Sequence, residues 1–231
     1  MRYPRNRITG VILAGGRARR MGGQDKGLID LAHRAMIEHV IMILRPQVGA
    51  LIISANRNAE IYEGFGYPVV PDAVEGYSGP LAGMASGMQH AKTPYIVIAP
   101  CDSPLVPANL VERLDLAMDR THADISVAHD GKRMQPVFAL LKSSLRASIM
   151  DFLAAGDRKL ERWVAEQKTA LADFSHRPEA FLNINTPEDR AALEKKFKDN
   201  AQQPQYTGPR LHRIQRHGEN HALTPADTPI A

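Results

Sequence analysis

A segment rich in glycine and basic residues, from Leu13 to Gly27, is the part of the sequence best suited to phosphate chemistry. It holds five glycines and four basic residues, namely Gly15, Gly16, Gly22, Gly23, Gly27, Arg17, Arg19, Arg20 and Lys26. Glycines let backbone N–H groups approach an anion closely, and fixed cations neutralise a triphosphate. The spacing fits neither a dinucleotide fingerprint nor a P-loop, and a flexible surface loop is the structural alternative.

A single carboxylate, Asp102, follows the apolar run Tyr95–Ala99 through Pro100 and Cys101. If that run is a strand of an α/β sheet, Asp102 lies at its carboxyl end, where such sheets carry their site residues. Magnesium at nucleotide sites takes one or two carboxylates together with phosphate oxygens and water, so Asp102 is a candidate Mg²⁺ ligand. The alternative is that Asp102 caps the following turn or helix. We expect Cys101 to be a small buried residue rather than a nucleophile.

Polar residues also occur near the ends of other predicted strands. Ser54 and Asn56 lie at the end of a second apolar run. Asn183 and Asn185 alternate in Phe181–Asn185, which we predict to be a strand, so that both side chains project to one face. Capping of the strand end by Ser54 or Asn56, and capping of the next helix by Asn185 or its neighbour, are the local alternatives.

Short apolar runs that alternate with helix-length segments must position these residues. The runs are often β-branched and bounded by turn residues, as is typical of buried strands: Ile8–Ala14, Ala50–Ala55, Tyr95–Ala99, Ile125–Ala128 and Val137–Leu141. Apolar positions trace one helical face in Met36–Val48, and Pro107 begins another helix. This alternation predicts a doubly wound, mostly parallel α/β sheet in a single domain, and Asp130-Gly131 predicts a hairpin that makes the sheet mixed.

The C-terminal part of the chain changes in composition. A helix is predicted from about Thr186 to Asp199, after which the sequence is rich in Gln, Pro and His and lacks apolar periodicity. We therefore expect one folded domain over residues 1–200 and a flexible tail over residues 201–231.

The bulk composition favours a globular enzyme of the cytoplasm. Every apolar run falls short of the roughly 18 residues needed for a transmembrane helix, and the N-terminus lacks the apolar core of a signal peptide. The single cysteine agrees with a reducing compartment. The net charge of +4 is concentrated at the two ends of the chain, so the neutral body argues against a nucleic-acid-binding face.

The residues Leu13-Ala-Gly-Gly16, followed by Arg20-Met-Gly22 and Lys26, resemble the signature of the MobA-type molybdenum cofactor guanylyltransferase family. The resemblance continues in order through Ser54-Ala-Asn-Arg57, Asp72, Gly79–Gly83, Pro100–Pro104, Gln135-Pro136 and Asn183–Pro187. Several spaced motifs in order are far more specific than one glycine loop. The resemblance implies a nucleotidyltransferase-like, Rossmann-type fold, and Ala32–Met36 departs from it where the family has a Gly-Lys-Pro turn.

The resemblance also implies roles for individual residues. Leu13, Ala14 and Gly15 are the backbone segment that meets GTP, Arg20 and Lys26 lie near its phosphates, and Asp102 holds Mg²⁺. Further nucleotide or pterin contacts are implied at Gly16, Gly23, Ser54, Asn56, Asp72, Gly79, Gly83, Asn183 and Asn185. For Gly83, close helix packing is the alternative explanation.

The activity implied by the resemblance is transfer of GMP from Mg–GTP to the phosphate of molybdopterin or Mo-molybdopterin, with release of pyrophosphate. A cytidylyltransferase for the same cofactor and a sugar-1-phosphate nucleotidyltransferase are the alternatives within the fold. Leu13-Ala-Gly-Gly16 favours guanine, because the cytidylyl relatives resemble Leu-Ala-Ala-Gly there. A non-catalytic nucleotide-binding or cofactor-binding protein is the alternative of another class. Besides the substrates, the expected partners are a molybdenum-insertion protein or apo-molybdoenzymes, with neither nucleic acid nor a membrane.

Overall fold

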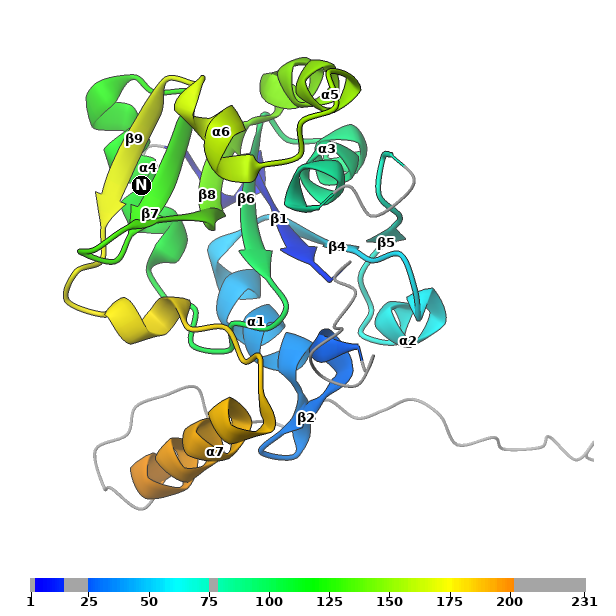
Figure 1. Ribbon diagram of the computed structural model, residues 1–231, viewed down its shortest axis with the longest axis vertical. Helices are drawn as coiled ribbons and strands as arrows, with labels where there is room; N and C mark the ends of the chain where they lie inside the picture. The colour runs from blue at the N-terminus through cyan, green and yellow to red at the C-terminus, as the bar shows by residue number, and fades with distance from the viewer. Residues whose placement is uncertain (1–2, 15–24, 75–78, 202–231) are drawn as a thin grey trace, which may run out of the picture.

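The computed structural model describes residues 3–14, 25–74 and 79–201. Within these residues, seven strands form one sheet in the order β5-β4-β1-β6-β8-β7-β9 (Figure 1). Their bounds are β1 Ile8–Leu13, β4 Ala50–Ser54, β5 Val69–Val70, β6 Tyr95–Pro100, β7 Ile125–His129, β8 Met134–Lys142 and β9 Thr169–Asp173. The five strands predicted from apolar runs are confirmed, and β5 and β9 are additional.

The sheet is mixed because one strand, β8, runs against its neighbours. β1 pairs in parallel with both β4 and β6, and β9 pairs in parallel with β7, whereas β8 is antiparallel to β6 and β7. The turn between β7 and β8 contains Gly131 at φ +94°, and the Asp130 carboxylate accepts the N–H groups of Lys132 and Arg133, both at 2.8 Å. The hairpin predicted at Asp130-Gly131 is confirmed.

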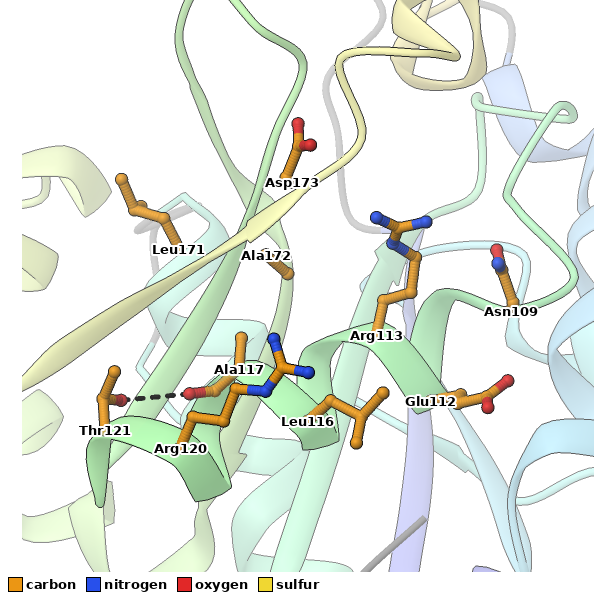
Figure 2. Close-up of a pocket in the computed structure, with 10 residues that line it drawn as sticks. All are labelled: Asn109, Glu112, Arg113, Leu116, Ala117, Arg120, Thr121, Leu171, Ala172 and Asp173. Atoms are coloured by element: carbon orange, nitrogen blue, oxygen red, sulfur yellow. Dashed lines mark hydrogen bonds between the residues drawn. The ribbon is translucent and has the colours of Figure 1, made fainter.

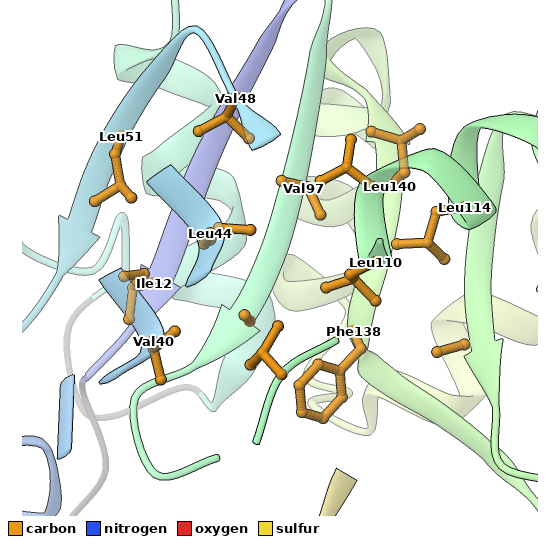
Figure 3. Close-up of a cluster of buried hydrophobic side chains, with 14 of the residues drawn as sticks. Ile12, Val40, Leu44, Val48, Leu51, Val97, Leu110, Leu114, Phe138 and Leu140 are labelled. Atoms are coloured by element: carbon orange, nitrogen blue, oxygen red, sulfur yellow. The ribbon is translucent and has the colours of Figure 1, made fainter. Parts of the chain in front are cut away.

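Helices cover both faces of the sheet. On one face lie α1 (Met36–Leu44) and α4 (Leu110–Thr121), whose apolar side chains meet those of β1, β4, β6 and β8 in the cluster drawn in Figure 3. On the other face lie α3 (Pro80–His90), α5 (Arg146–Ala154) and α6 (Leu160–Ala165), which bury a second cluster. Successive strand residues alternate between the clusters, as in Ile96 and Val97, so the central strands β1, β6 and β8 are apolar on both faces.

Two helices lie outside these layers. The short helix α2 (Ala59–Glu63) follows β4, and α7 (Pro187–Ala201) lies beside the β2–β3 hairpin at one end of the sheet (Figure 1). A third apolar cluster, which includes Leu31, Met36 and Leu193, joins α7 to that hairpin. No helix in the described part of the chain has the length and apolar character needed to cross a membrane.

The remaining elements are a short hairpin and single 3₁₀ turns. The hairpin pairs β2 (Asp30–Leu31) with β3 (Arg34–Ala35). The 3₁₀ turns are η1 Arg5–Arg7, η3 Lys26–Leu28, η4 Arg45–Gln47, η5 Ser143–Leu145 and η6 Pro178–Phe181.

The direction in which the strands are added reverses beside β1. The chain leaves β1 for β4 through α1 on one face of the sheet, then crosses back through α3 on the other face to reach β6, on the opposite side of β1. In open α/β sheets, ligands bind at the carboxyl ends of the strands where the order reverses in this way. The fold therefore directs attention to the carboxyl ends of β1, β4 and β6.

The β2–β3 hairpin forms a tight turn without glycine. Leu31 pairs with Arg34, so Ala32 and His33 are the two loop residues, and both have left-handed backbones, at φ 51° and 66°. A two-residue turn of this kind favours Asn or Gly because side chains with a Cβ are strained there. The departure from the family pattern thus leaves the turn in place but strained.

Replacing His33 with glycine is expected to stabilise the protein by about 1 kcal/mol, because the left-handed strain is removed. The hydrogen bond from the His33 backbone N–H to Asp30 does not depend on the side chain and is retained. Denaturant unfolding of His33→Gly measures the gain. Lys195→Gly is the control, since Lys195 is exposed within α7 and its replacement by glycine should lower stability. A loss in both variants would show that the turn is not strained.

Candidate functional site

The carboxyl ends of β1, β4 and β6 are joined by hydrogen bonds that continue the sheet past the strands. The N–H of Ala14 donates to the carbonyl of Ser54 at 2.7 Å, and the N–H of Cys101 donates to the carbonyl of Leu13 at 3.0 Å. The side chains that leave these three strand ends are therefore held on a common rigid edge. Leu13, Ala14, Ser54 and Asp102 all lie there, as the sequence predicted.

Lys26, Asp102 and Asn185 form one polar cluster at this edge. The Lys26 Nζ donates to Asp102 Oδ2 at 2.8 Å and to Asn185 Oδ1 at 2.6 Å. Asp102 is 8% exposed, and the Lys26 side chain is 21% exposed, so the ion pair is largely shielded but reachable. The carboxylate thus contacts a cation rather than capping the turn that follows it. An ammonium has three hydrogens, so Lys26 retains one for a further acceptor.

Asn183 and Asn185 reach the cluster from a segment that is not a strand. The predicted strand Phe181–Asn185 is wrong: η6 ends at Phe181, and the following residues are extended without a neighbouring strand. The Ile184 N–H donates to the Asp102 carbonyl at 2.9 Å, and the buried Ile184 side chain turns away between the two asparagines. Proline at the start of η6 favours the helical turn over a strand.

The alternative capping roles are also resolved by hydrogen bonds. Thr186 caps α7: its Oγ1 accepts the N–H of Asp189, whose carboxylate accepts the N–H groups of Asn185 and Thr186. The Asn185 side chain is thereby left to contact Lys26. Asn183 Oδ1 accepts the hydroxyl of the fully buried Ser103 at 2.6 Å. Asn183 therefore braces the loop that carries Asp102, and Asn185 holds Lys26.

A second polar group surrounds Asp72. Asn56 Nδ2 donates to Asp72 Oδ2 at 2.7 Å, and Asn56 Oδ1 accepts the backbone N–H of Asp72 at 2.8 Å. The hydroxyl of Ser54 lies 3.4 Å from Asp72 Oδ1. Burial raises the pKa of Asp72, while the hydrogen bonds from Asn56 and Ser54 oppose that shift. Ser54 and Asn56 thus hold a carboxylate rather than cap the strand.

Gly79 and Gly83, which were predicted to contact the nucleotide, are each favoured by a different feature of the backbone or packing around α3. Gly79 precedes the helix at φ +77°, a conformation that suits glycine alone. At Gly83 a Cβ would come within 2.8 Å of Ser54 Oγ and 3.0 Å of Leu13 Cδ2. Close packing of α3 on the ends of β1 and β4 therefore accounts for Gly83, while leaving Gly83 next to Asp72.

Four predicted residues lie outside the described part of the chain, namely Gly15, Gly16, Arg20 and Gly23. The roles assigned to them stay predictions. Cys101 is buried, and burial, followed by the neighbouring Asp102 carboxylate, raises the pKa of its thiol well above the usual value. A thiol in this state is a poor nucleophile, as expected from the sequence.

The hydrogen bonds that hold Asp25, the residue before Lys26, were not predicted from the sequence. The Asp25 carboxylate accepts hydrogen bonds from the Tyr62 hydroxyl at 2.6 Å and from Asn58 Nδ2 at 2.9 Å. The only sequence signal was that Asp25 directly precedes Lys26, since Tyr62 is 37 positions away.

A hollow of about 520 Å³ lies elsewhere, between α4 and the edge strand β9 (Figure 2). Arg113 and Arg120 project into it from α4, and Leu171 and Asp173 come from β9. None of the predicted site residues that the structure describes lines it. The hollow is therefore separate from the strand-end site.

Comparison with known proteins identifies the family. The model of the MobA-like NTP transferase domain matches residues 10–171. The chain belongs to this family. The chain is 52% identical over 186 residues to the molybdenum cofactor guanylyltransferase of Shewanella sediminis, covering 80% of this chain and 95% of that protein. The corresponding protein of Shewanella piezotolerans is 50% identical, with 80% and 91% covered.

Solved structures of MobA-like proteins share the fold. The molybdopterin-guanine dinucleotide biosynthesis protein A of Archaeoglobus fulgidus superposes with a TM-score of 0.69 at 22% identity, covering 83% of this chain and 99% of that one. The mixed, doubly wound sheet and the MobA resemblance inferred from the sequence are both confirmed, and the chain is a nucleotidyltransferase.

Proposed function

We propose that this MobA-like chain transfers GMP from Mg–GTP to the terminal phosphate of molybdopterin or Mo-molybdopterin and releases pyrophosphate. The observation that carries the proposal is the convergence of Lys26, Asp102 and Asn185 at the carboxyl edge of the sheet, in a chain 52% identical to a guanylyltransferase for the molybdenum cofactor. A cation, a carboxylate and an amide at the edge where the strand order reverses suit a nucleoside triphosphate.

The two polar groups suit the two ends of GTP. Asp72, with one oxygen committed to Asn56 and the other only at 3.4 Å from Ser54, retains acceptor capacity for the N–H groups of a guanine. Asp102, which follows β6, and Lys26, which contacts it from η3, suit the triphosphate. Gly15, Gly16, Arg20 and Gly23 are proposed to add to the phosphate-binding surface, and Leu13 and Ala14 to line it with backbone.

Magnesium fits the residues present. Asp102 Oδ2 is engaged by Lys26, and Oδ1 has no hydrogen bond among the described residues. The same residues include no group of three His, Cys, Asp or Glu side chains that could hold an ion by themselves. A metal that arrives with the triphosphate needs only one such carboxylate, and it would supply neutralisation of the phosphate charge.

The transfer needs positioning rather than proton removal. An oxygen of the acceptor phosphate, already an anion at neutral pH, forms a bond to the α-phosphorus as the bond from that phosphorus to the pyrophosphate oxygen breaks. Lys26 stabilises the charge that grows on pyrophosphate with its remaining hydrogen, while Asn185 and Asp102 keep the ammonium in place. The asparagine pair, Asn183 and Asn185, is proposed to meet the pterin side.

A nucleotide panel tests the assignment. With molybdopterin as the acceptor, kcat/KM for pyrophosphate release is expected to be about 100-fold or more higher for GTP than for CTP or ATP, because the wrong base leaves the Asp72 group unpaired. Asp102→Asn protein, purified in the same way, controls for contaminating activity.

Each alternative has its own outcome in that panel. Equal turnover with CTP would favour a cytidylyltransferase for the same cofactor. Pyrophosphate release with sugar 1-phosphates, but not with molybdopterin, would favour the sugar-nucleotide alternative. Tight binding of Mg–GTP without release of pyrophosphate would indicate a binding protein. A molybdenum-insertion protein and apo-molybdoenzymes are proposed as partners, and the cytoplasm as the location.

A further inference from the structure

The residue before Lys26 carries a carboxylate that is almost completely enclosed. The Asp25 side chain is 5% exposed. Its Oδ1 accepts the Tyr62 hydroxyl at 2.6 Å and the Gly27 N–H at 3.3 Å. Its Oδ2 accepts Asn58 Nδ2 at 2.9 Å, with Arg57 Nε at 3.9 Å. A carboxylate with this many donors has one stable position.

The donors to Asp25 are themselves fixed. Tyr62 is fully buried in α2, and burial raises the pKa of its hydroxyl, so that the group stays protonated and donates. Asn58 precedes α2 with a left-handed backbone, at φ 54°, a conformation that asparagine tolerates. The geometry of the β4–α2 connection therefore aims both side chains at Asp25.

The space around Gly27 shows how closely Tyr62 packs against η3, the turn that begins at Lys26. A Cβ at Gly27 would come within 2.5 Å of the Tyr62 hydroxyl and 3.2 Å of Cys101 Sγ. Asp25 also accepts the N–H of Leu28 through its backbone carbonyl at 3.0 Å, which closes the turn η3. The backbone of Lys26 thus lies between Asp25 and Gly27. Asp25 is held by a hydrogen bond from Tyr62, and Gly27 packs against the same hydroxyl.

One segment reaches both polar groups of the site. Asn56 holds Asp72, and Asn58, two residues further on, holds Asp25. The segment that places the proposed base contact therefore also places the proposed phosphate contact.

We propose that Tyr62 and Asn58 are positioning residues for nucleotidyl transfer, which act through Asp25 to place the Lys26 ammonium; this inference rests on the proposed function. Neither side chain needs to touch the substrate. Their role is to keep the Lys26 backbone at the distance from which its side chain reaches Asp102 and Asn185 together.

The test is Tyr62→Phe, which removes one hydroxyl and keeps the buried ring. We expect kcat/KM for Mg–GTP in pyrophosphate release to fall by about 10- to 100-fold, the range for loss of a hydrogen bond to a charged group. Asn58→Gly tolerates the left-handed backbone and removes the side chain that contacts Asp25, and its kcat/KM should fall as well. Tyr67→Phe is the matched control, since Tyr67 packs against the first apolar cluster, and its kcat/KM should stay within about twofold of wild type.

The decisive readout is the same substitution in a Lys26→Gln background. If Tyr62 acts through Lys26, Tyr62→Phe should there reduce kcat/KM by less than about threefold, because the group it positions is gone. An equal reduction in both backgrounds, or wild-type kinetics in Tyr62→Phe, would overturn the inference. Thermal unfolding of each variant ensures that folded protein is compared.

Failure of the proposed function gives a different result. In that case the wild-type protein itself releases no pyrophosphate with GTP and molybdopterin. The positioning role of Tyr62 and Asn58 is then decided by calorimetric affinity for Mg–GTP across the same variants. About tenfold weaker binding in Tyr62→Phe, absent in the Lys26→Gln background, supports it, and unchanged affinity overturns it.

Discussion

Replacing Asp102 with asparagine is expected to lower turnover with Mg–GTP by about three orders of magnitude while leaving the fold intact. Asparagine has the size of aspartate, and its Oδ1 can still accept the Lys26 ammonium. The bond from the Ile184 N–H goes to the backbone carbonyl of residue 102 and is unaffected. What is lost is the negative charge, and with it the proposed magnesium ligand.

Steady-state kinetics over a magnesium titration, together with thermal unfolding, measure the effect. Asp124→Asn is the matched control, because Asp124 forms a lysine ion pair of similar length, 2.6 Å to Lys142, on the half-exposed surface. It should retain wild-type turnover and lose at most about 1 kcal/mol of stability. Near-normal turnover of folded Asp102→Asn at saturating magnesium would contradict the metal-ligand role.

The central strands were predictable because burial on both faces leaves a clear pattern in their sequence. β1, β4 and β6 are covered on both faces, so their residues form continuous apolar runs that stand out from the helices. β9 was missed because it is an edge strand. Its inward residues are the small Ala170 and Ala172, and its Leu171 is 52% exposed, so the apolar signal is weak.

In the candidate site, the residues at strand ends were predictable from the sequence, whereas the contacts between distant loops were not. Ser54 and Asp102 were found because a strand end is a local feature of the sequence. The strand predicted at Phe181–Asn185 was wrong, yet Asn183 and Asn185 still reach the site, because alternation of side chains requires only an extended backbone and not a sheet partner. The pairing of Lys26 with Asn185, 159 positions apart, follows from the fold alone.

The position of the inserted antiparallel strand also could not be read from composition. Asp130-Gly131 indicated a hairpin, but that β8 lies between β6 and β7 depends on how the hairpin packs on the sheet. On its other side β6 pairs in parallel with β1. That pairing, rather than the position of β8, keeps Asp102 beside the end of β1, where Lys26 contacts it.

Lys26→Gln should lower kcat by about 100- to 1000-fold, the effect of removing one fixed group that stabilises transition-state charge. Glutamine is uncharged, so it cannot neutralise the charge that develops on pyrophosphate, and its shorter side chain does not bring a donor to Asp102 and Asn185 as the ammonium does. Because the Asp102 carboxylate remains, the magnesium concentration needed for half-maximal rate should change much less than in Asp102→Asn. The two variants therefore separate charge stabilisation from metal binding.

Two further variants sharpen this prediction. Lys26→Arg keeps the charge, but a planar guanidinium cannot reproduce short contacts to both partners, at 2.8 and 2.6 Å, so an activity between those of wild type and Lys26→Gln is expected. Lys142→Gln, which removes a short lysine ion pair outside the site, should leave kcat unchanged. If Lys26→Gln retained wild-type kcat and raised only the KM for GTP, Lys26 would bind substrate and transition state equally, and its assignment to catalysis would fail.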